Sequence, residues 1–149
     1  MADPLSQILA HQQQALAAMT AEGLLDEQFQ QLLALQDESN PDFVSEVAEL
    51  YFDDALPKIQ RVGQLLSEAA PDFGELDAVV HQFKGSSASL GAGGMAKLCI
   101  RMRELCQQRD VAGCQALVMQ MQEQFMRLKQ QLSVFLSLEA QRKQLAGGG

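Results

Sequence analysis

The strongest constraint on the fold is a regular apolar spacing in the C-terminal part of the chain. Apolar side chains recur there at alternating intervals of four and three residues, at Cys114, Val118, Met121, Phe125, Leu128, Leu132 and Phe135. Such a seam lies along one face of an α-helix and has to be covered by other helices. The sequence therefore predicts a helix that begins near Val111, is the longest in the molecule, and packs in a helical bundle.

Three upstream segments, about 41–67, 73–90 and 95–109, also carry apolar faces with helical spacing. The face of the first consists of Val44, Ala48, Tyr51, Ala55, Ile59, Val62 and Leu66. The face of the third comprises Met95, Leu98, Met102 and Leu105. Short loops join the four helices, so we expect an antiparallel up-down-up-down four-helix bundle whose core spans about residues 40–138.

Two additional N-terminal helices are expected at about 4–20 and 26–36, packed on the bundle. Their predicted buried side chains are Leu5, Ile8, Leu9, Leu16 and Met19 in the first and Phe29, Leu32 and Leu33 in the second. The last residues, 141–149, are predicted to form a frayed, flexible tail. No internal repeat is present, and the prediction is one all-α domain over residues 1–149.

Local signals indicate where helices begin and bend. Residues 40–42, Asn-Pro-Asp, are typical of a helix start with a capping side chain and a proline in the first turn. Asp72 and Glu75 form a start similar to a capping box. Pro57 forfeits one intrahelical hydrogen bond, but the apolar periodicity continues in phase across it. We therefore expect a kink over residues 53–57 rather than a break.

Composition excludes several classes of protein. Nearly half of the residues are hydrophobic, which argues against disorder, and the net charge of −8 argues against non-specific binding to nucleic acid. No apolar run approaches the length of a membrane span, and residues 1–4 lack the build of a signal peptide. The three cysteines have no metal-ligand spacing and fall largely on apolar faces, which predicts reduced core residues of an intracellular protein: Cys99, Cys106 and Cys114.

A polar run, His-Gln-Phe-Lys-Gly-Ser-Ser at residues 81–87, stands out within the helix expected at 73–90. At about 100° per residue, His81 projects roughly 120° away from the centre of the apolar face, and Lys84 and Gly85 share its outward sector. Glycine in the middle of a helix is disfavoured by about 1 kcal/mol relative to alanine. A bare backbone beside an exposed histidine therefore indicates a surface that another molecule must approach.

This run resembles the phosphoacceptor motif of the histidine-containing phosphotransfer proteins, and residues 81–92 resemble the plant branch of that family. The similarity extends from about Asn40 to Leu136. An exposed neutral imidazole has a ring-nitrogen lone pair that can attack phosphorus. The resemblance implies that His81 is the phosphoacceptor. It also implies that three side chains support the phosphoryl group, Lys84, Gln82 and Ser86. Gly85 and Ala88 would form the surface that the partner approaches.

The family resemblance also implies partners. Phosphate would come from a receiver-domain aspartate of a hybrid sensor kinase and pass to a receiver aspartate of a response regulator. The receiver would supply the Mg²⁺, so we expect no metal site, no cofactor and no autonomous kinase activity in this chain. In the plant branch the relay serves cytokinin signalling between cytoplasm and nucleus, and some members with Asn at the histidine position act as inhibitors. His81 is present, so we expect a competent carrier, as a monomer without nucleic-acid or membrane partners.

Two further sets of charged or titratable residues lie outside this run. Lys97, Arg101 and Arg103 lie on the outward face of the next helix, either as a basic flank that complements an acidic receiver or as a solvated face. His11 has no neighbouring Lys-Gly pair and is interpreted as an ordinary surface histidine.

Two alternative functions compete with that of a carrier. A nucleotide-binding enzyme is suggested weakly by the glycines of residues 91–94 followed by Lys97, but the required preceding strand and Gly-Lys-Ser/Thr register are missing. The stronger alternative is a helical adaptor that docks receiver domains without being phosphorylated.

Overall fold

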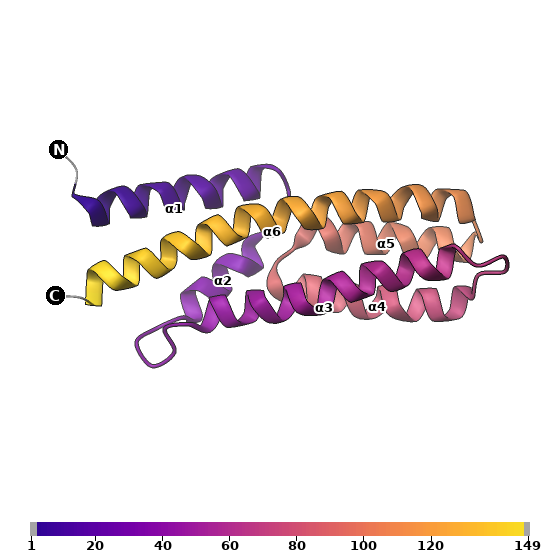
Figure 1. Cartoon of the computed structure of the whole chain (residues 1–149), viewed down its shortest axis with the longest axis horizontal. Helices are drawn as coiled ribbons and strands as arrows, with labels where there is room; N and C mark the ends of the chain where they lie inside the picture. The colour runs from indigo at the N-terminus through magenta and orange to yellow at the C-terminus, as the bar shows by residue number, and fades with distance from the viewer. Residues whose placement is uncertain (1–2, 148–149) are drawn as a thin grey trace.

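The computed structural model describes residues 3–147, which form six α-helices and no β-strand (Figure 1). The helices are α1 (Pro4–Ala21), α2 (Glu27–Leu35), α3 (Phe43–Leu66), α4 (Phe73–Leu90), α5 (Gly93–Gln107) and α6 (Val111–Gly147). None of the helices in this described part is both long and apolar enough to span a membrane.

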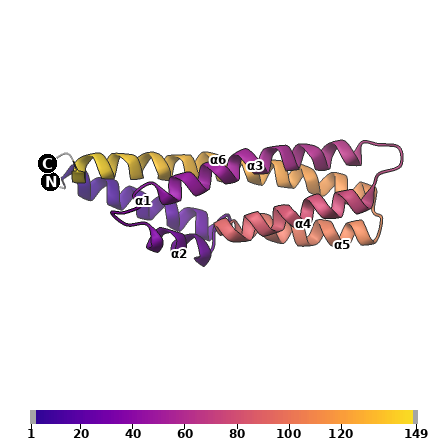
Figure 2. The ribbon, with the colours of Figure 1, turned by 90° about the horizontal axis from the view of Figure 1, so that it is seen from below.

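The last four helices form the predicted antiparallel bundle. Each of α3, α4 and α5 packs on the next helix, and α3 closes the ring against α6, so α4 and α6 lie diagonally opposite each other. The two N-terminal helices lie outside this ring, α1 along the C-terminal half of α6 and α2 against α4 and α3 (Figures 1 and 2). The all-α fold and its two additional N-terminal helices are confirmed.

The core follows the sequence seams closely. All seven seam residues predicted in α6 and all seven predicted in α3 are buried. Aromatic contacts join the layers: the Tyr51 and Phe83 rings stack with centroids 6.2 Å apart, and Phe29 meets Phe135 edge-on at 5.8 Å. Full burial of a Val, Leu, Ile, Phe or Met side chain contributes about 1.5–3 kcal/mol to the free energy of unfolding. The buried seams are therefore a main source of the stability of the bundle.

Burial is weaker than predicted at six positions, most of all at Leu9 on α1. Leu9 is 41% exposed, although the periodicity predicts an inward direction for it. Among the described helices α1 packs on α6 alone, so only a narrow stripe of α1 is covered and Leu9 lies beside it. The other five are partly rather than fully buried: Leu5, Ile8 and Leu16 on α1, Leu33 on α2 and Leu98 on α5.

The start of α3 differs from the prediction. The helix begins at Phe43, so Asn40 lies too early in the chain to cap it. Asn40 belongs instead to a tight turn before the helix, in which the Asp37 carboxylate accepts a hydrogen bond from the Asn40 backbone N–H at 3.1 Å. The first-turn N–H of Val44 is satisfied instead by the side-chain oxygen of Gln36, at 3.0 Å. A side chain from the preceding segment thus replaces the expected local cap.

Two other local predictions agree with the structure. The Asp72 carboxylate accepts a hydrogen bond from the Glu75 N–H at 3.1 Å, which confirms the capped start of α4. The third helix continues without a break through Pro57. The kink expected just before this proline stays a prediction.

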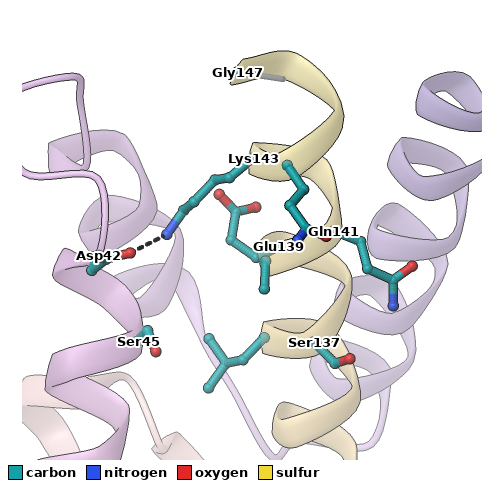
Figure 3. A pocket seen from close by; sticks show the side chains of 10 residues that line it. Asp42, Ser45, Ser137, Glu139, Gln141, Lys143 and Gly147 are labelled. Atoms are coloured by element: carbon teal, nitrogen blue, oxygen red, sulfur yellow. Dashed lines mark hydrogen bonds and ion pairs between the residues drawn. The ribbon is translucent and has the colours of Figure 1, made fainter. Parts of the chain in front are cut away.

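The expected frayed tail is wrong for residues 141–147, which continue α6. Ion pairs hold this segment: Lys143 reaches Asp42 at the start of α3, with 2.8 Å between Nζ and Oδ1 (Figure 3). Arg142 pairs with Glu139 on the same helix. These pairs and the neighbouring α1 stabilise the end of the helix. The final two residues of the predicted tail lie outside the described residues.

Glu139 joins three elements through one buried carboxylate. It accepts hydrogen bonds from the side-chain amides of Gln12 on α1, at 2.7 Å, and of Gln36 at the end of α2, at 3.1 Å, as well as from Arg142. Burial alone would raise the pKa of Glu139, but the hydrogen bonds from Arg142 and Gln12 outweigh it and hold the pKa below its ordinary value. The charged form of Glu139 therefore attaches the N-terminal helices to α6.

Two backbones come into close contact at the turn between α4 and α5. Gly91 ends α4 with φ = 90°, and its carbonyl accepts a hydrogen bond from the Asp26 N–H at 2.9 Å. A Cβ on Gly91 would lie 2.3 Å from the Phe29 backbone nitrogen, and one on Gly94 would lie 2.4 Å from the carbonyl oxygen of Gly23. The glycine run is thus a packing contact for the α1–α2 turn and the start of α2, which gives it a structural reason that needs no nucleotide.

We expect Gly91→Ala to lower the free energy of unfolding by at least about 2 kcal/mol, from left-handed strain and overpacking. Gly63→Ala is the matched control, because Gly63 lies inside α3 and no other group lies within 4 Å of the place that a methyl group would take. It should raise stability by up to about 1 kcal/mol. Urea unfolding of both variants measures the difference, and equal stability of the two would contradict the close contact at Gly91.

Acid unfolding tests the Glu139 carboxylate. Its folded-state pKa is lowered from 4.5, so its contribution to stability is complete above that pH and is lost as pH falls through the folded-state pKa. In Glu139→Gln this titration is absent. We expect the stability difference between wild type and variant to be constant at neutral pH and to shrink in acid, as followed by urea unfolding at a series of pH values. A difference that widens in acid would contradict the assigned direction.

Candidate functional site

His81 lies on the exposed side of α4, away from the core, as the periodicity predicts. Its neighbours Val80 and Phe83 are fully buried against the other bundle helices, which fixes the rotation of α4 about its axis. The imidazole is exposed on a helix whose opposite face is tightly packed. The position of the ring is therefore set by the core of the bundle and not by a mobile loop.

Arg103 on α5 reaches across to this histidine. Its Nη1 lies 3.0 Å from Nδ1 of His81, while its Nε and Nη2 lie 2.9 and 3.4 Å from the two oxygens of Asp77, one turn before the histidine. The hydrogen bond with Asp77 raises the pKa of Arg103. A guanidinium group has donors only, so Nδ1 is the acceptor. Nε2 of His81 has no partner among residues 3–147 and is the ring nitrogen open to another molecule.

The predicted phosphate-supporting residues are placed differently from one another. Lys84 is partly buried one turn after His81 and forms no ion pair within the described chain, so its ammonium group is available to an anion. Gln82 is exposed, and no hydrogen bond holds its amide in the described residues. The Ser86 hydroxyl donates to the Phe83 carbonyl oxygen at 3.1 Å, so it is bound to its own helix. Their roles toward a phosphoryl group stay predictions.

The predicted approach surface is open. Gly85 is part of the continuous helix α4, and no other group lies within 4 Å of the place where its Cβ would be. Ala88, one turn later, is exposed. A partner can therefore come close to the backbone of α4 directly beside the histidine.

The predicted basic flank separates into two parts. Lys97 and Arg101 lie on the outer side of α5, and Arg101 pairs with Glu104 on its own helix at 3.0 Å. Arg103 instead contacts the site itself, which sequence reasoning missed. The available signal was the outward direction of Asp77, four residues before His81, since a carboxylate on that side of the helix can pair with a cation of the neighbouring helix.

Ser87 is a polar residue on the apolar face of α4, and its contact with α3 explains why it is there. Its hydroxyl is fully buried and lies 2.9 Å from the hydroxyl of Tyr51 on α3. Burial raises the pKa of Tyr51, so the phenol stays protonated. This hydrogen bond anchors α4 to α3 behind the exposed run.

Other candidate groups lie elsewhere. His11 is exposed on α1 without a partner in the described chain, as expected of a surface histidine. All three cysteines are buried and free, which confirms them as core residues, and burial raises the pKa of the Cys99 thiol to about 12. Within residues 3–147, no cluster of three or more His, Cys, Asp or Glu side chains is arranged to hold a metal ion.

A large hollow lies far from His81, between the start of α3 and the end of α6 (Figure 3). Its volume is about 780 Å³, and its lining includes Asp42, Ser45, Glu139 and Lys143. The charged groups in it are already paired, Asp42 with Lys143 and Glu139 with the side-chain amides and Arg142. Nothing in this hollow offers a reactive group, and His81 does not line it.

Comparison with known proteins places this site in a family. The family model of the Hpt domain matches residues 46–133, which include His81 and all of α4 and α5. Histidine-containing phosphotransfer protein 1 of Oryza sativa subsp. japonica is 46% identical over 123 residues, which cover 83% of this chain and 84% of that protein.

A solved structure has the same fold. The crystal structure of a histidine-containing phosphotransfer protein from maize superimposes with a TM-score of 0.86 and 41% identity, and covers 90% of this chain and 98% of the maize chain. Another rice protein, Pseudo histidine-containing phosphotransfer protein 2, is 40% identical over 78% of this chain and 78% of its own length. Overall similarity therefore does not separate the two kinds of relative. The chain belongs to the Hpt-domain family, the histidine phosphotransfer carriers of two-component signalling.

Proposed function

We propose that this protein carries a phosphoryl group in a multistep phosphorelay, with His81 as the phosphoacceptor. His81 receives the group from a receiver-domain aspartate of a hybrid sensor kinase and passes it to a receiver aspartate of a response regulator. The observation that carries this proposal is a rigidly positioned, exposed imidazole whose Nε2 is open, with Lys84 one turn away and the bare backbone of Gly85 beside them.

The chemistry required of this chain is small. The Nε2 lone pair of His81 attacks phosphorus in line with the leaving carboxylate of the donor. Lys84 offers a positive charge to the phosphoryl oxygens. The acidic receiver supplies the Mg²⁺ that its own carboxylates bind, and the carrier neither needs ATP nor phosphorylates itself.

An apolar groove next to the site supports docking of a protein partner. The groove, of about 450 Å³, lies between α3 and α4 and is lined by Val47, Leu50, Tyr51, Asp54, Ser86, Ser89 and Leu90. Leu50 is 70% exposed there, a large apolar surface beside a polar site. Burial of Leu50 under a receiver would add apolar contact area beside the phosphoacceptor.

The finer setting of the relay is part of the same proposal. We place the protein in cytokinin-type signalling, as a monomer that moves between cytoplasm and nucleus, because its relatives include flowering-plant carriers. Localisation of a fluorescent fusion and response-regulator phosphorylation after cytokinin treatment test this setting. A helical adaptor that docks receivers without phosphorylation is the alternative, and the same surface would serve it.

His81→Gln should abolish phosphoryl acceptance from a phosphorylated receiver without loss of the fold. The side chain points to solvent, so the stability change should stay within about 0.5 kcal/mol. Acid-labile, alkali-stable label on the purified protein is the measurement, with circular dichroism as the check on folding. His11→Gln is the matched control and should label like wild type.

Undiminished label on His81→Gln would reject the site, and an absence of label on wild type would favour the adaptor. Incubation with ATP and Mg²⁺ alone should give no label. Stoichiometric label from ATP would instead indicate a kinase.

Gly85→Gln should keep or raise the melting temperature while it slows transfer sharply. The helical backbone at Gly85 accepts a side chain, and Gly in mid-helix is disfavoured by up to about 1 kcal/mol. A longer side chain would hold a receiver away from His81, and a displacement of about 1 Å can slow transfer on the order of a hundredfold. Rapid-quench transfer assays and thermal unfolding measure the two effects.

Ala116→Gln provides the control, since Ala116 is exposed on α6, the helix diagonal to α4. It should leave transfer unchanged. A Gly85→Gln protein that is destabilised but transfers normally would show that this glycine serves the backbone and not the partner.

A further inference from the structure

Arg103 constrains the proton on the imidazole of His81. The guanidinium Nη1 lies 3.0 Å from Nδ1, and a guanidinium can only donate, so Nδ1 must present its lone pair to Arg103. In the neutral ring the single proton is then on Nε2, the nitrogen that faces the partner. While this hydrogen bond is intact, the exposed nitrogen carries an N–H group rather than the lone pair that attacks phosphorus.

Asp77 holds the Arg103 guanidinium in place beside His81. It binds Arg103 through both carboxylate oxygens, at 2.9 and 3.4 Å, from the turn of α4 that precedes His81. Both side chains of the pair are only about one-third exposed, at 38% for Asp77 and 31% for Arg103. Asp77 therefore holds Arg103 in a position from which Nη1 reaches Nδ1 of the histidine.

The same hydrogen bond has a consequence after phosphorylation. In transfer onto His81, the Nε2 lone pair forms the P–N bond as the P–O bond to the donor carboxylate breaks, and the ring afterwards releases the proton on Nδ1 to solvent. In the reverse direction or in hydrolysis, Nδ1 has to regain a proton first. Only then does the electron pair of the breaking P–N bond remain on a neutral imidazole, while the acceptor oxygen, of a carboxylate or of water, bonds to phosphorus.

We propose that Arg103, held by Asp77, is a positioning residue that keeps Nδ1 of His81 free of a proton both before and after phosphorylation, and so prolongs the life of the phosphohistidine. The proposal rests on phosphorylation of His81 at Nε2. An arginine N–H and a proton compete for one lone pair, so the bond to Arg103 opposes the protonated ring through which phosphate leaves. Transfer requires Arg103 to turn away from Nδ1, so that a proton can take its place on that nitrogen.

The unphosphorylated protein provides the first test. Nitrogen-15 NMR of the imidazole distinguishes the two tautomers, and the chain has two histidines, so His81→Gln assigns the signals. We expect the proton of His81 on Nε2 in wild type and a mixture of tautomers in Arg103→Met. A wild-type ring with its proton on Nδ1 overturns the proposal, whether or not any variant folds.

The phosphorylated protein provides the second test. The full chain is phosphorylated with phosphoramidate, and loss of phosphate from the isolated carrier is followed at neutral pH. Arg103→Met should shorten the phosphohistidine lifetime about five- to tenfold, the factor for one hydrogen bond of ordinary strength. Arg101→Met is the matched control, because it removes the same charge from the same helix but Arg101 pairs with Glu104 and not with the groups around His81. It should keep the wild-type lifetime.

The outcomes separate this inference from the proposed function. Equal lifetimes of wild type and Arg103→Met overturn the inference, as does an equal shortening in Arg101→Met, which would indicate a general charge effect. A failure of phosphoramidate to label His81 rejects the proposed phosphoacceptor instead, and the tautomer measurement still decides the role of Arg103.

Discussion

The close contact of the α4–α5 turn with the α1–α2 turn and the start of α2 is the constraint on which the arrangement of the site depends. Two backbones meet there without side chains between them, at Gly91 against Phe29 and at Gly94 against Gly23. Because α4 must end at this turn and α5 must begin directly after it, the two helices are fixed as an antiparallel pair. That pairing sets Arg103 of α5 beside His81 of α4.

The helix that carries the histidine combines a rigid inner face with a low outer face. Its inner side is held by complete burial of Val80 and Phe83 and by the hydroxyl pair of Ser87 and Tyr51. Because the inner face fixes the helix, the outer face needs no bulky residues and can end in the bare backbone at Gly85. The buried side of α4 therefore keeps the helix rigid, while its exposed side leaves His81 accessible to a partner.

The sequence predicted the elements well and the contacts between them poorly, for a physical reason. The seams of α3 and α6 and the outward direction of His81 follow from periodicity along a single helix, which is local information. Arg103, the capping by Gln36 and the ion pairs of the α6 end depend on which elements become neighbours, and no local spacing encodes that. Leu9 shows the same limit, since its burial depends on how many helices cover α1.

A phosphoryl carrier has two requirements that oppose each other, and the geometry around His81 meets them at different nitrogens. The group must persist between encounters, which favours an unprotonated Nδ1, and must leave quickly in a complex, which favours a protonated one. A donor such as Arg103 at Nδ1 serves the first requirement while Nε2 stays open to the partner. A receiver site rich in carboxylates can attract the guanidinium and so remove the constraint when transfer is needed. The Asp77–Arg103 pair would then make the lifetime of the phosphohistidine depend on whether a partner is bound, without any movement of the bundle itself.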